Sequence, residues 1–85
     1  MKPRGLFVTK TGETALDAVT EEEAPFVIRA LASLLDPRVP LVRPGQDVSI
    51  THGSAIIGRP VPGTSLTICY VPLGEVFFLI NLHRE

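Results

Sequence analysis

The sequence predicts a small α+β domain, and three patterns support this. Residues 20–35 combine a helix-start motif with an apolar stripe, whereas the second half of the chain alternates between apolar and polar residues, as strands do. The run Val76–Leu82 is apolar at nearly every position, which is typical of a strand inside a sheet. At 85 residues, the chain is expected to form one domain spanning residues 1–85.

The composition excludes several classes of protein. Hydrophobic residues make up 45% and charged residues 20% of the chain, which indicates a globular protein. The net charge of −1 and a pI near 6.1 are not those of a strongly basic nucleic-acid-binding domain. No apolar run approaches the ~18 residues of a membrane helix. Cys69 is the single cysteine, so we expect no disulfide and no cysteine-rich metal site, which fits a cytoplasmic location. The sequence has no group of residues at metal-ligand spacing and no cofactor motif, so neither a metal nor a cofactor is expected.

The front of the chain is expected to hold one strand and two helices. Leu6–Val8 is a short apolar run that predicts a first strand. A short helix is expected around 13–19 and a longer one over about 21–35, starting at the capping-box pattern Thr20-Glu21-Glu22-Glu23. Pro25 lies one turn inside the second helix, so a kink is expected there.

The second half is expected to be a sheet that follows an irregular linker. Prolines and a glycine prevent regular structure over 38–46. Beyond it, extended runs alternate with turn residues. The expected strands cover Val48–Thr51, Ala55–Ile57, Leu66–Tyr70 and Val76–Leu82, with a hairpin turn over Val71–Glu75.

The C-terminal half resembles the final hairpin of the RelE/ParE superfamily of toxin–antitoxin toxins. The residues Leu66-Thr67-Ile68-Cys69-Tyr70-Val71, a short turn, and then the apolar strand that ends in His83-Arg84 carry this resemblance. It implies a short N-terminal strand, a helical pair and a three-stranded antiparallel sheet. It also implies a toxin held inactive by a cognate antitoxin protein, as a homodimer or hetero-oligomer. Some family members cut mRNA on the ribosome without a metal, and others inhibit DNA gyrase.

The resemblance also implies candidate site residues. In a nuclease of this family, His83 and Arg59 would be catalytic, and Arg84 and Arg43 would bind RNA. An imidazole titrates near ~6.5 and can move protons, and a guanidinium can clamp a phosphate. Arg59 is expected in a loop, between Gly58 and Pro60. The alternative is that Arg59 is merely exposed there, and that His83 and Arg84 are solvated at a strand end, on opposite faces.

The rival function is a non-catalytic protein-interaction module on the same fold, such as a gyrase inhibitor or a degenerate toxin. The family usually opens its penultimate strand with an arginine, whereas this chain has Gly63-Thr64-Ser65-Leu66-Thr67. That difference and the low positive charge favour the rival. Tyr70 is expected to be a core aromatic, and Cys69 a small strand residue rather than a nucleophile.

Overall fold

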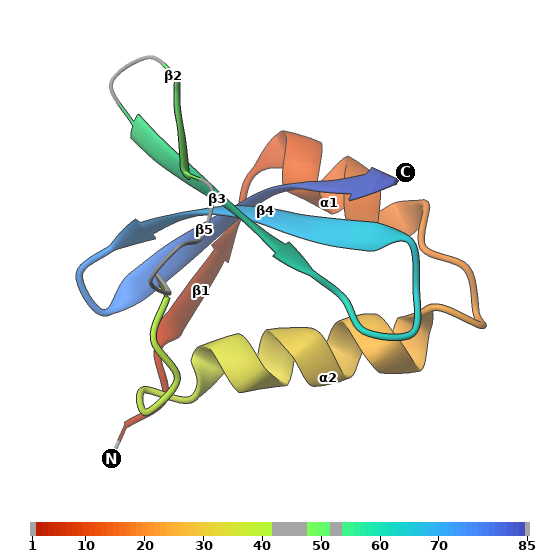
Figure 1. Cartoon of the computed structure of the whole chain (residues 1–85), viewed down its shortest axis with the longest axis horizontal. Coiled ribbons are helices and arrows are strands. Elements are labelled where there is room, and N and C mark those ends of the chain that lie inside the picture. The colour runs from red at the N-terminus through yellow and green to blue at the C-terminus, as the bar shows by residue number, and fades with distance from the viewer. Residues whose placement is uncertain (1, 42–47, 52–53, 85) are drawn as a thin grey trace.

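Two helices pack against one face of a mixed β-sheet (Figure 1). The computed structural model describes residues 2–41, 48–51 and 54–84. Along these residues the elements are β1 (Gly5–Val8), α1 (Lys10–Asp17), α2 (Ala24–Leu35), β2 (Val48–Thr51), β3 (Ser54–Pro60), β4 (Leu66–Leu73) and β5 (Val76–Arg84). The spatial order is β1-β5-β4-β3-β2, with β1 parallel to β5 and the other neighbours antiparallel. The predicted α+β class is confirmed.

The strand count differs from the three-stranded antiparallel sheet that the resemblance implied. Among the described residues, four strands follow the helices. The additional strand arises because β2 and β3 form their own hairpin, in which Val48 pairs with Ile57 and Thr51 pairs with Ser54. Two short extended runs that are close in sequence therefore give two paired strands. The expected strand at Val76–Leu82 is confirmed as part of β5, which lies between β1 and β4.

Helix α1 begins earlier, and helix α2 later, than the sequence patterns suggested. Helix α1 starts at Lys10, because the Thr9 side chain accepts a hydrogen bond from the Gly12 N–H at 3.1 Å and so caps it. The Thr20–Glu23 capping box forms, but as a turn that precedes α2. Pro25 therefore falls in the first turn of α2, where no intrahelical N–H is needed. The expected kink is wrong, and α2 is continuous from Ala24 to Leu35.

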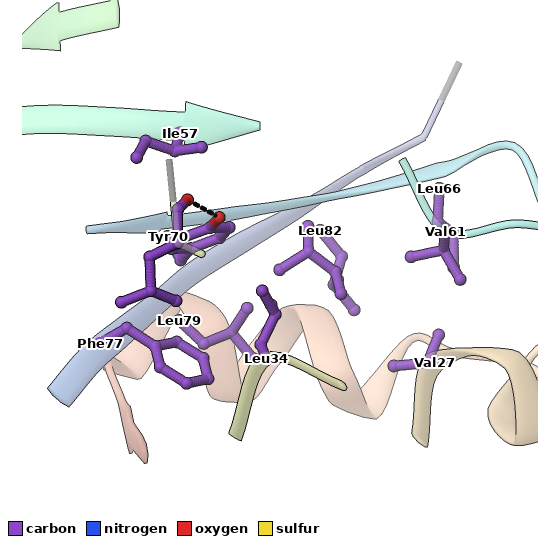
Figure 2. Close-up of a cluster of buried hydrophobic side chains, with 11 residues drawn as sticks. Val27, Leu34, Ile57, Val61, Leu66, Tyr70, Phe77, Leu79 and Leu82 are labelled. Atoms are coloured by element: carbon purple, nitrogen blue, oxygen red, sulfur yellow. Dashed lines mark hydrogen bonds between the residues drawn. The ribbon is translucent and has the colours of Figure 1, made fainter. Parts of the chain in front are cut away.

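The hydrophobic core fills the space between the helices and the sheet (Figure 2). Tyr70 is fully buried, as expected, and its ring meets that of Phe77 edge-on with centroids 5.7 Å apart. The Tyr70 hydroxyl donates a hydrogen bond to the carbonyl of Leu41, which holds the start of the linker onto the core. The other buried core residues are Val27, Leu34, Leu41, Ile57, Val61, Leu66, Ile68, Leu79 and Leu82.

A β-bulge in β5 determines which residues reach this core. Tyr70 pairs with Leu79, but Cys69 pairs with Asn81, so Ile80 is an extra residue in β5. Side chains alternate along a strand, and one extra residue reverses the alternation that follows it. Phe77 and Leu79 therefore face the helices before the bulge, and Leu82 does so after it.

The β4–β5 hairpin is tighter than the turn expected over Val71–Glu75. Leu73 pairs directly with Val76, which leaves Gly74 and Glu75 as the connection. Gly74 has φ of 61°, a left-handed conformation that glycine adopts without steric cost. The strands consequently extend into the expected turn, and Pro72 pairs with Phe77.

Replacing Leu79 with alanine is expected to lower the free energy of unfolding by about 2–5 kcal/mol, because it opens a cavity in the core. The matched control is Ile28→Ala on α2, whose side chain is 67% exposed. That change is expected to stay within about 0.5 kcal/mol. Urea denaturation of both variants provides the measurement, and similar losses at both positions would contradict the described core.

Candidate functional site

No described element covers the sheet face opposite the helices (Figure 1). On this open face, residues of β4 lie beside their partners on β5: Thr67 beside His83, Val71 beside Phe78, and Leu73 beside Val76. Phe7 joins them from β1, where it pairs with Phe78. We call this surface the open face, and it comprises Phe7, Thr67, Cys69, Val71, Leu73, Val76, Phe78 and His83.

The open face divides into a polar end and an apolar end. Phe7 and Leu73 are 54% and 58% exposed, unusually high for large apolar side chains within strands. The rings of Phe7 and Phe78 stack with centroids 5.3 Å apart. The apolar patch comprises Phe7, Val71, Leu73, Val76 and Phe78. Sequence reasoning missed this patch because it assigned Val71–Glu75, and with it Leu73, to a turn.

His83 and Arg84 face opposite sides of the sheet, as strand alternation predicted. His83 is exposed on the open face beside Thr67, at the end of the sheet away from the apolar patch. Arg84 points toward the helices, where it lines a hollow of about 540 Å³ beside α1 together with Lys10 and Leu82. One substrate phosphate therefore cannot lie against both side chains in this arrangement.

Arg84 is held in an ion pair that joins the end of β5 to the start of α2. Its guanidinium donates to both carboxylate oxygens of Glu23, with the Nη2–Oε1 distance at 2.7 Å. The same carboxylate accepts hydrogen bonds from the backbone N–H and the hydroxyl of Thr20, each at 3.1 Å. The Arg84 hydrogen bond and then those from Thr20 lower the pKa of Glu23 to about 2. These contacts give Arg84 a structural partner, whereas its RNA-binding role stays a prediction.

Arg59 lies in strand β3, and its predicted position in a loop is wrong. It pairs with Ile68 of β4, and its side chain is only 7% exposed on the helix side of the sheet. Its Nη2 donates a hydrogen bond to the Pro40 carbonyl at 2.8 Å, which ties the linker to the sheet. Because a buried guanidinium of this kind supports the fold, replacing it would reduce stability as well as any activity.

The three candidate residues within the described part of the chain do not form one cluster. Arg43 lies outside the described residues. His83 faces the open side, whereas Arg59 and Arg84 face the helix side at separate hollows, one beside α2 and the other beside α1. The strand pattern could predict the separation of His83 from Arg84, but not the burial of Arg59, which depends on the distant linker.

Cys69 is half-buried on the open face, near neither of these hollows. Burial raises the pKa of its thiol, although a backbone contact with His83 acts in the opposite direction. A raised pKa keeps the thiol protonated near neutral pH, and a thiol is a weak nucleophile compared with a thiolate. This agrees with the interpretation of Cys69 as a strand residue.

Within the described part of the chain, no group of histidine, cysteine or acidic residues has the arrangement of a metal site. Neither described helix is long and apolar enough to cross a membrane. Comparison with protein-family models, characterised proteins and solved structures gives no significant match. Functional inference therefore depends on the geometry above.

The Glu23–Arg84 ion pair is expected to contribute stability that acid removes. The folded pKa of Glu23 is about 2, below its ordinary value of 4.5, so its contribution is complete above that ordinary value. The contribution then declines as the pH falls from 4.5 toward 2. We expect Glu23→Gln to have a lower Tm than wild type at pH 7, and the difference to vanish near pH 2.

Thermal unfolding followed by circular dichroism over this pH range checks the expectation. The control is Glu22→Gln, a neighbouring exposed residue outside the capping contacts. A Tm difference between wild type and Glu23→Gln that stays constant from pH 7 to pH 2 would be inconsistent with the ion pair.

Proposed function

We propose that this chain is a RelE/ParE-like toxin component that acts by binding a protein target rather than by cutting RNA. The observation that carries the proposal is the apolar patch on the open face. Its exposed Phe7 and Leu73 lie on β1 and β4, and Phe78 of the intervening strand β5 stacks on the Phe7 ring. Contiguous exposed apolar surface of this kind marks protein interaction sites.

The order of the elements supports the toxin-like part of the proposal. A short strand, two helices and then consecutive antiparallel strands follow one another, as the resemblance implied. The partners expected for such a component are a cognate antitoxin that keeps it inactive and a target such as DNA gyrase. An exposed β1 edge next to the patch could extend the contact through backbone pairing.

The positions of the candidate catalytic residues favour binding over cleavage. Metal-independent RNA cleavage needs an acid–base group and cations directed at the same phosphate. Here His83 lies on the open face, whereas Arg59 is buried and Arg84 is paired with Glu23 on the other side. The ribosome-dependent nuclease is therefore the alternative that the experiment must separate from the proposal.

Expression of the wild-type chain in a permissive bacterium is expected to arrest growth while cellular mRNA stays intact. Leu73→Asp places a charge in the apolar patch at an exposed position and should restore growth. The matched control, Ile28→Asp, places the same charge on the exposed side of α2 and should leave the arrest unchanged. His83→Ala should also leave the arrest unchanged, since its side chain has no catalytic part in this account.

Growth curves, mRNA integrity by primer extension and plasmid topology are measured together. Fragmented mRNA in the wild type that becomes intact in His83→Ala would replace the proposal with the nuclease. Normal growth with folded wild-type protein present would contradict a toxin of either type. Arg59→Ala cannot replace His83→Ala in this test, because Arg59 is buried and hydrogen-bonded to the linker, and its loss would lower stability whether or not it is catalytic.

A further inference from the structure

A hollow of about 590 Å³ lies between α2 and the segment that follows β3. Figure 1 shows this segment descending from the sheet toward α2 before β4 begins. The side chains that matter here are Phe26, Arg29 and Ser33 from α2, and Arg59, Pro60 and Pro62 from the facing strand and loop. The hollow lies on the helix side of the sheet, so it is separate from the open face and its apolar patch.

Helix geometry explains why α2 presents these residues together. Phe26, Arg29 and Ser33 are spaced by three and then four residues, which places them along one side of a helix. Val27 and Leu34 occupy the adjacent side and are buried in the core. Helix α2 therefore has one side for the core and a second side for the hollow.

The loop is fitted closely to the Phe26 ring. Gly63 has φ of 86°, which disfavours other residues, and a Cβ atom added there would lie 2.7 Å from the ring. The close approach fixes Phe26 as one wall of the hollow. Pro60 and Pro62 also line the hollow and present apolar rings without backbone N–H donors.

The hollow combines these apolar walls with cationic side chains. Arg29 is exposed at its mouth and has no acidic partner among the described residues. No aspartate or glutamate is among the described residues that line the hollow. Arg59 contributes a second guanidinium from the inner wall, where its hydrogen bond to the Pro40 carbonyl fixes its position. The Ser33 hydroxyl adds a neutral hydrogen-bonding group.

We propose that this hollow binds a small aromatic carboxylate. Its volume lies within the roughly 300–1,000 Å³ of small-molecule sites, which are mostly apolar with a few placed polar groups. Arg29 pairs with the carboxylate through its planar guanidinium, and Ser33 donates a further hydrogen bond. The ligand's ring lies against Phe26 and the prolines. Phosphate is disfavoured because the two lining prolines contribute no backbone N–H donors, and such donors commonly form phosphate sites.

Phenylacetate is a suitable probe, titrated into the full-length chain while amide chemical shifts are followed by NMR. We expect saturable shifts at Arg29, Ser33 and Gly63, with a Kd on the order of 1 mM for a probe this small. The neutral analogue 2-phenylethanol should bind about tenfold or more weakly, because it lacks the charge that Arg29 recognises. Inorganic phosphate should also bind more weakly, because it lacks the ring.

Arg29→Gln should weaken phenylacetate binding about tenfold while leaving the fold intact, since glutamine is a good helix former. Arg38→Gln is the matched control: it removes the same charge from an exposed site that pairs with Asp36 outside the hollow. The proposal would be overturned by unsaturable shifts, by equal binding to the two variants, or by phosphate binding as tightly as phenylacetate. These readouts use purified protein and are independent of growth arrest, so this proposal and the proposed function can fail separately.

Discussion

The bulge at Ile80 is the constraint on which the arrangement of the second half depends. Strand β5 supplies Phe77 and Leu79 to the core near its start and Leu82 near its end. In a regular strand Leu82 would face the side opposite to Phe77 and Leu79, because side chains alternate between the two faces. The extra residue of the bulge reverses the alternation, so that all three side chains face the core. The same residue turns Arg84 toward Glu23 on the helix side and leaves His83 on the open face. Core packing therefore determines where the candidate functional side chains lie.

Elements with a local cause were predictable from the sequence. The Thr20–Glu23 capping box, the apolar stripe of α2 and the apolar run of β5 each depend on residues close together in the chain, and each is present. The burial of Tyr70 also followed from alternation along its strand. Boundaries were less predictable: Pro25 and the capping turn shifted the start of α2, and a glycine turn lengthened the final hairpin.

The features that sequence reasoning missed depend on contacts between distant segments. Arg59 lies between a glycine and a proline, a context typical of loops, yet pairing with β4 makes it part of a strand and its contact with Pro40 helps to bury it. The apolar patch could not be predicted because its exposure depends on both helices packing on the opposite face. Likewise, the hollow beside α2 forms only where the loop carrying Gly63 meets Phe26.

The central claim is that the bulge places His83 on the open face and Arg84 on the helix side rather than the reverse. Nuclear Overhauser contacts in the full-length chain test it most directly. The account predicts contacts from the Arg84 side chain to Glu23, and from the His83 ring to Thr67 on the open face. It also predicts no contact between the His83 ring and α2. Contacts that place the His83 ring against α2, or the Arg84 side chain beside Thr67, would contradict the account.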